Sequence, residues 1–191
     1  RYPDYDESIQ RWIHQDPSLG YRLAVDLARL SERSGPRWLF ISHSLGGGVQ
    51  QHTQHLAALI RDELDGVVWL LQPRDERSVQ LTWFGEDSGL NIPIVHDQLS
   101  SALLALAPEL GIQRLHFHHL AGLPALVLEL PNQLGLPFDF TFHDFYAVCP
   151  SPTHFISRNW RYLGRSDLSE CEICVAERPD PWGLGILDWR A

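Results

Sequence analysis

The stretch from Trp38 to Val49 constrains the fold of this chain more than any other. Trp38 to Ser42 are mostly large and apolar, which predicts a short buried strand. Three consecutive glycines, Gly46 to Gly48, then allow a sharp turn, because glycine adopts positive φ without a steric cost. From Val49 onward, apolar residues recur at the spacing of one helix face: Leu56, Leu59, Ile60 and Leu64. The stretch therefore predicts a strand, a glycine turn and a helix.

Three interpretations of this turn remain open. A helix entered through glycines presents free backbone N–H groups and the positive end of its dipole, which suits a phosphate. The segment Ser42 to Gly46 also has the form of a nucleophile elbow, in which Ser44 would be the nucleophile of a serine hydrolase. A tight turn without a ligand is the third interpretation. The dinucleotide fingerprint is excluded, because consecutive glycines do not give the G-x-G-x-x-G spacing and no acidic residue closes the next strand.

Composition narrows the class of protein. With 191 residues, of which 44% are hydrophobic and 20% charged, the chain is long enough for one domain with a substantial core. A net charge of −9 without a dense Lys/Arg cluster argues against nucleic acid or an anionic membrane as the main partner. No apolar run approaches the roughly 20 residues of a transmembrane segment. The absence of methionine predicts a piece of a longer polypeptide.

The order of the expected elements predicts an α/β fold. Residues 1–35 are expected to be a linker with an approach helix, whose apolar stripe is formed by Leu23, Leu27 and Leu30. Residues 36–191 are expected to be a single domain. Strands are expected at 66–71, 79–84, 92–95, 112–119 and 138–142, and helices at 99–110 and 124–130. Strands that alternate with helices over short connections predict a doubly wound, mainly parallel sheet with helices on both faces. Residues 149–191 are expected to be an irregular segment containing the cysteines.

Polar residues end three of the expected strands. His43 follows the first strand, His118-His119 follow another, and His143-Asp144 follow the last. Ligands of open α/β sheets bind beyond the carboxyl ends of the strands, so these residues are candidate functional groups. The alternative for any single histidine is a satisfied or exposed residue without a ligand. His116 and His118 share one strand face, so at least one of them is expected to be structural.

The three cysteines suggest a metal site. Cys171 and Cys174 have the C-x-x-C spacing of a metal knuckle, and Cys149 offers a third thiolate for zinc or an iron cluster. His154 or another histidine would be the fourth ligand. Three cysteines are too few, and odd in number, for a disulfide framework, which predicts a reducing cytoplasm. Redox catalysis is less favoured, because an irregular segment is not the start of a helix after a strand.

The hydrolase interpretation has less support than the anion-binding one. An elbow serine normally lies in mid-sheet, whereas Ser44 follows the first expected strand. Asp97 and His143 can be proposed as its partners, but nothing singles them out.

Four segments together resemble the amino-terminal half of the family 4 glycosyltransferases, which are retaining enzymes with two Rossmann domains. The segments are HSLGGGVQQH (43–52), HFHHLAGLP (116–124), PFDFTFHDFYAVCP (137–150) and CEIC (171–174). The resemblance spans roughly residues 37 to 175. It implies that this chain is a Rossmann-like domain on the acceptor side of such an enzyme.

The resemblance also implies an activity: transfer of a sugar, of the hexosyltransferase type, from a nucleotide-sugar to an acceptor hydroxyl in glycan or polysaccharide biosynthesis. Gly46 to Gly48 would lie near the donor phosphates, with His43, His118 and His119 in the same substrate-binding region. His143 would contact the donor sugar as a catalytic residue, and Asp144 would help to place the sugar. No cofactor is required, and the cysteines would hold at most a structural zinc. A fourth cysteine, expected near Tyr162 to Gly164, is missing.

The carboxy-terminal Rossmann domain, which holds most of the nucleotide in such enzymes, is not part of this sequence. We therefore expect residues 1–191 alone to be inactive. The rival from another class is a non-enzymatic Rossmann-like module that binds a glycan or a partner.

Overall fold

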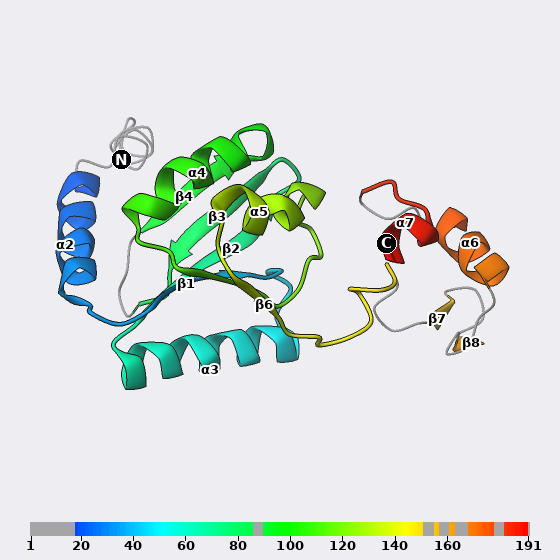
Figure 1. Ribbon diagram of the computed structural model, residues 1–191, viewed down its shortest axis with the longest axis horizontal. Coiled ribbons are helices and arrows are strands. Elements are labelled where there is room, and N and C mark those ends of the chain that lie inside the picture. Colours follow the sequence, from blue (N-terminus) through cyan, green and yellow to red (C-terminus); the bar gives the residue numbers. More distant parts are fainter. Residues whose placement is uncertain are drawn as a thin grey trace, which may run out of the picture.

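The computed structural model describes residues 18–85, 90–150, 155–156, 161–162, 168–177 and 182–190. It is an α/β fold built on a six-stranded mixed sheet in the order β4-β3-β2-β1-β5-β6 (Figure 1). The strands are β1 (Arg37–Ile41), β2 (Val67–Asp75), β3 (Ser78–Trp83), β4 (Asn91–Val95), β5 (Arg114–Phe117) and β6 (Phe138–Phe140). All the strands expected from the sequence are therefore present, although β5 and β6 are shorter than expected.

The sheet is parallel on one side only. β1 pairs in parallel with β2 and with β5, and β5 pairs in parallel with β6. β2 with β3, and β3 with β4, pair antiparallel, so the expected mainly parallel sheet is a mixed sheet in which only β2, β1, β5 and β6 are parallel. The physical reason is the short link between Asp75 and Ser78, since a parallel crossover needs a dozen or more residues. β4 is an edge strand. Pro93, which has no N–H to donate to a neighbouring strand, is tolerated there because one side of the strand is unpaired among the described residues.

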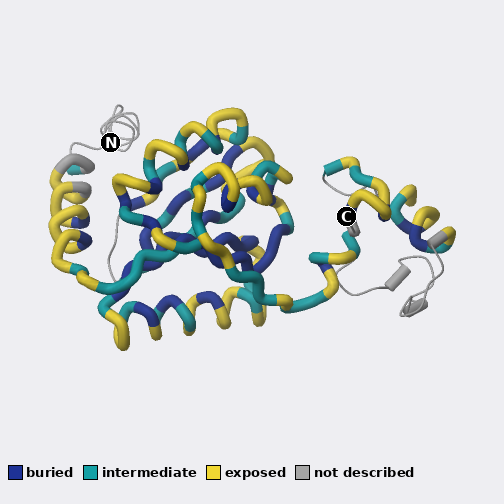
Figure 2. The backbone as a smooth tube through the Cα atoms, in the orientation of Figure 1, coloured by how far each residue is buried: buried dark blue, intermediate teal, exposed yellow. Residues whose placement is uncertain are grey.

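Helices cover both faces of the sheet. Strand residues alternate between faces, so Leu39 and Ile41 belong to the large core, whereas Phe40 belongs to a smaller cluster on the other face. The large core is covered by α4 (Leu99–Glu109), η2 (Ala125–Glu129) and α5 (Leu130–Leu134), and η1 (His96–Gln98) precedes α4 with no buried residue. The smaller cluster is covered by α3 (Gly47–Leu64), whose inner side is buried in Figure 2. The expected helix at 124–130 is thus a 3₁₀ turn that continues into α5.

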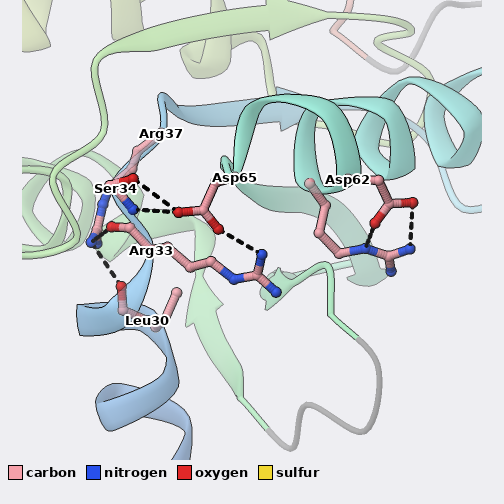
Figure 3. A network of polar contacts seen from close by, with 7 residues as sticks. Leu30, Arg33, Ser34, Arg37, Asp62 and Asp65 are labelled. Carbon is pink, nitrogen blue, oxygen red and sulfur yellow. Dashed lines mark hydrogen bonds and ion pairs between the residues drawn. The ribbon is translucent and has the colours of Figure 1, made fainter.

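The amino end of the sheet is tied to α2 (Leu19–Glu32) by a polar network (Figure 3). Asp65, at the end of α3, accepts hydrogen bonds from Arg33 Nη1 at 2.9 Å and from the Ser34 N–H at 2.9 Å and Oγ at 3.0 Å. The Ser34 backbone bond, followed by the Arg33 guanidinium, lowers the pKa of Asp65. Arg37 Nη2 donates to the carbonyl of Leu30 at 2.9 Å. Each of these groups therefore has a partner.

α2 packs through fewer apolar residues than the sequence predicts. Leu30 is buried, as the expected stripe requires, but Leu27 is 54% exposed. The polar network at the carboxyl end of α2 adds to the contact that Leu30 makes with the core.

The carboxy-terminal segment contains more regular structure than expected. It forms β7 (Phe155–Ile156), β8 (Arg161–Tyr162), α6 (Leu168–Glu177) and α7 (Ile186–Arg190). Leu168–Glu177 contains neither glycine nor proline, so a helix can form there within a segment that is otherwise polar. Two tryptophans attach the segment to the domain: Trp182 Nε1 donates to the Leu123 carbonyl at 2.7 Å, and Trp189 Nε1 donates to the Tyr146 carbonyl at 2.9 Å.

Within the described ranges, none of the helices has the length and apolar character needed to cross a membrane.

Candidate functional site

The polar residues predicted at the strand ends gather at the carboxyl ends of the parallel strands. β1, β5 and β6 are parallel neighbours, so their carboxyl ends lie side by side (Figure 1). His43 follows β1, His118-His119 follow β5, and His143-Asp144 follow β6 at this edge, while α3 begins there at Gly47. The carboxyl ends of β1, β5 and β6 therefore carry the polar residues that the sequence predicted for these three strands.

His119 and Asp144 are joined by a hydrogen bond. His119 Nδ1 accepts the Ala121 N–H at 3.1 Å, so in the neutral ring the proton is on Nε2. Nε2 then donates to Asp144 Oδ2 at 3.1 Å, and Asp144 Oδ1 accepts the Tyr146 N–H at 2.8 Å. The Tyr146 ring stacks on His119 with 4.7 Å between centroids. Asp144 thus holds the His119 ring and the loop after β6 in place.

His43 fixes the entry to the glycine turn. Its Nδ1 accepts the Leu45 N–H at 3.1 Å, and its carbonyl accepts a hydrogen bond from Gln72 Nε2 at 2.9 Å. Its ring lies 4.5 Å from that of His119, centroid to centroid. Burial, with the neighbouring His119, lowers the pKa of His43, so the ring is neutral at pH 7. In the structure His43 supports the turn that opens α3.

The glycine turn has the predicted backbone conformation at two of its positions. Gly46 has φ of 84° and Gly47 of 75°, whereas Gly48 lies within the helix at negative φ. The N-cap position of α3 is Gly46, and no described side chain caps the helix, so its first N–H groups lack the partner that a capping residue would supply. A Cβ placed at Gly47 or Gly48 would meet no atom within 4 Å. Among the described residues, the space beside Gly47 and Gly48 is therefore open.

A cluster of histidines lies beside this turn. His52 of α3, His118 and His143 each place one ring nitrogen within 4.8 Å of the nitrogens of the other two. His118 is 1% exposed, and neither of its ring nitrogens has a hydrogen-bond partner among the residues described. His143 Nε2 is likewise buried and unpaired within that part of the chain. Burial lowers the pKa of His143, and burial with the rings of His116, His143 and His52 lowers that of His118 to about 3.

The structure assigns a different role to each histidine of the pair on β5. His116 Nε2 lies 2.8 Å from Thr141 Oγ1, and its ring stacks on that of His118 at 4.1 Å between centroids. His116 Nε2 therefore has a hydrogen-bond partner within the protein, whereas neither ring nitrogen of His118 has one among the described residues. Sequence reasoning missed His52. The available signal was its place in the second turn of a helix that begins at the strand ends.

The predicted cysteine site falls elsewhere in the fold. Cys171 and Cys174 lie inside α6 and are buried, which corrects their placement in an irregular segment, and Cys149 is half-buried. Among the described residues, one group of acidic, cysteine and histidine side chains lies close enough to share an ion. It consists of His52, His118 and His143 and contains no cysteine. His154, the suggested fourth ligand, lies outside the described residues. A cysteine metal site stays a prediction.

The geometry gives no support to a serine hydrolase triad of Ser44, Asp97 and His143. Ser44 is exposed and has no hydrogen bond to a histidine within the described part of the chain. Asp97 follows β4 and His143 follows β6, and these strands form opposite edges of the sheet. Five strand spacings correspond to about 24 Å, which is too far for a triad.

A small cavity of about 10 Å³ lies at the carboxyl ends of β5 and β6. His118, His119, His143 and Asp144 are among the residues that border it. Its volume is near the lower limit for one water molecule or ion. A larger pocket of about 640 Å³ lies at the opposite end of the sheet, between α2 and the end of α3. The chain matches no protein-family model, no curated protein and no solved structure.

Proposed function

We propose that this chain is the acceptor-side Rossmann-like domain of a family 4 glycosyltransferase, which transfers a sugar from a nucleotide-sugar to a glycan acceptor. One observation carries the proposal. The uncapped, glycine-opened start of α3 and the histidines that follow three strands all lie at the carboxyl ends of the parallel strands. In this proposal β2, β1, β5 and β6 are the Rossmann-like part, and β3 and β4 are an antiparallel extension.

The start of α3 would receive the donor diphosphate. Its free N–H groups and positive dipole end favour an anion, and open space beside Gly47 and Gly48 lets phosphate oxygens approach the backbone. His143 would contact the donor sugar. Asp144 would act as a positioning residue through His119, because its carboxylate already accepts two hydrogen bonds.

A single domain of this kind supplies half of an active site. The side chains at this edge are mainly neutral imidazoles, which do not neutralise a leaving diphosphate. Cationic groups for that purpose would come from the second Rossmann domain. We therefore expect residues 1–191 to bind a nucleotide-sugar weakly and to have no transferase activity alone. A cytoplasmic location belongs to the same proposal.

The test is a titration of the isotopically labelled chain with UDP-glucose and GDP-mannose, followed by amide NMR shifts. Shifts gathered at Gly46–Val49, His118 and His143 would support the proposal, with inorganic phosphate as the reference anion. If short glycans cause shifts and nucleotide-sugars do not, the result would favour a glycan-binding module instead. If no sugar causes shifts, it would favour a partner-binding module. Turnover by the isolated chain would contradict the half-site.

Two matched variants separate binding from folding. Gly48→Asp places a negative charge in the first helical turn, where it favours the helix but repels a diphosphate. Gly48→Asn has nearly the same shape without the charge. We expect the nucleotide-sugar shifts to be lost in Gly48→Asp and retained in Gly48→Asn. Equal binding by both variants would exclude the start of α3 as the phosphate site.

A further inference from the structure

The histidine cluster at the strand ends contains an unusual buried group. His118 is 1% exposed, yet both of its ring nitrogens lack a hydrogen-bond partner among the described residues. A buried polar atom without a partner costs about 1–3 kcal/mol, so such groups are rare unless something else satisfies them. The imidazole of His143 also has a buried, unpaired nitrogen in the same part of the structure.

We infer that His52, His118 and His143 form a binding site for a divalent transition-metal ion of the zinc class. Their ligand nitrogens all lie within 4.8 Å of one another, and the ring centroids are 5.0 to 5.8 Å apart. The three residues come from α3, from the end of β5 and from the loop after β6. A metal ion would join these elements and supply a partner for His118.

The ligand chemistry selects the kind of metal. Three imidazoles without a carboxylate suit zinc, copper, nickel or cobalt, whereas magnesium and calcium prefer oxygen ligands. Metal ligation requires the neutral ring, and the burial that lowers the pKa of His118 and His143 keeps both rings neutral at pH 7. Three protein ligands leave a fourth position open for water or another ligand.

Binding requires a modest contraction of the cluster. Nitrogens that share one tetrahedral zinc lie about 3.3 Å apart, given zinc–nitrogen bonds of about 2.0–2.1 Å. His52 is exposed on α3 and can approach by a change of rotamer. His118 is held from behind by the ring of His116, which is itself bonded to Thr141. The buried histidine is thus the fixed ligand, and His52 is the one that closes the site.

The test is binding of Zn²⁺ and Co²⁺ to the untagged chain at pH 7, by calorimetry and by cobalt absorption. We expect one ion per chain and a cobalt spectrum without a thiolate charge-transfer band. His52→Ala removes an exposed ligand with little risk to folding, and His55→Ala, also exposed on α3, is the matched control. We expect His52→Ala to weaken binding at least about tenfold, since even outer-shell changes cost about 10–100-fold, and His55→Ala to have no effect.

Further variants identify the ligands independently of sugar binding. His143→Ala should weaken binding to a similar extent, and the double variant Cys171→Ser/Cys174→Ser should leave it unchanged. Absence of stoichiometric binding, equal affinity of His52→Ala and the parent, or loss of binding in the cysteine variant would overturn the inference. Failure of the nucleotide-sugar titration would leave this result intact, because the metal measurements contain no sugar or nucleotide.

Discussion

The two ends of the sheet differ in how completely their polar groups are paired. At the amino end, Asp65 accepts hydrogen bonds from Arg33 and Ser34, and Arg37 donates to the end of α2 (Figure 3). At the carboxyl end, His118 is buried without a partner from the described residues, and the first N–H groups of α3 have no side-chain cap. Satisfied groups stabilise the fold, whereas buried unpaired groups lower its stability, and the two proposed ligand sites rest on unpaired groups.

The largest expected effect is on acid stability through His118. Its pKa is lowered to about 3 in the folded chain from the ordinary value of 6.5. As pH falls below 6.5 the unfolded chain takes up a proton that the folded chain does not, so stability falls, by about 1 kcal/mol per pH unit. His118→Phe keeps a ring of similar shape but cannot be protonated. In urea unfolding at a series of pH values, its free energy of unfolding should therefore fall less between pH 6.5 and about pH 3 than that of the parent.

An unpaired buried imidazole should be replaceable by an apolar ring without loss of stability. A lower stability of His118→Phe than of the parent at pH 7 would therefore contradict the claim that His118 lacks a partner among the described residues.

The next effect is expected at the amino end. Asp65→Ala removes the acceptor of three hydrogen bonds and places alanine at φ of 52°, so the melting temperature should fall clearly. Asp62→Ala is the control, since Asp62 is exposed and pairs with its neighbour Arg61, and it should change the melting temperature little.

The pH dependence of Asp65 gives a second readout. Its folded pKa is lowered, so its contribution is present above the ordinary value of 3.8 and is lost as pH falls through the folded pKa. The stability difference between the parent and Asp65→Ala should therefore shrink below pH 3.8. A constant difference would mean that the strained backbone, rather than the charge, is responsible.

A smaller effect is expected where the carboxy-terminal segment meets the carboxyl end. Trp189→Phe keeps an aromatic ring against Tyr146 but loses the hydrogen bond to its carbonyl. The expected loss is about 1 kcal/mol, seen as faster proteolysis of the segment after residue 150. Unchanged proteolysis would show that this contact does not attach the segment.

The smallest effects test the glycine turn. Gly48→Ala should raise stability by about 0.5–1 kcal/mol, because Gly48 is helical with open space beside it. Gly47→Ala should lower stability by a similar amount, since Gly47 has φ of 75°. Thermal melts of both variants check the opposite signs. Equal signs would show that the turn rearranges.

Local features of the fold were predictable, and pairings were not. Large apolar side chains in Trp38–Ile41 and the glycines after them predicted β1 and the start of α3 correctly. The antiparallel placement of β3 follows from a turn of two residues, which the expectation of a parallel sheet overlooked. The helix at Leu168–Glu177 was missed because residues 149–191 were judged as one polar, irregular segment, although this stretch itself has no helix breaker.

The candidate site divides in the same way. The sequence by itself determined that His43, His118 and His143 end strands, because apolar runs and breaks are local and a parallel sheet aligns its carboxyl ends. Only the tertiary structure decided that His52 approaches His118 and His143, that Asp144 bonds to His119, and that His118 has no such partner among the described residues. These relations depend on how α3 packs across the strands, and contacts between residues distant in the chain leave no local pattern in the sequence.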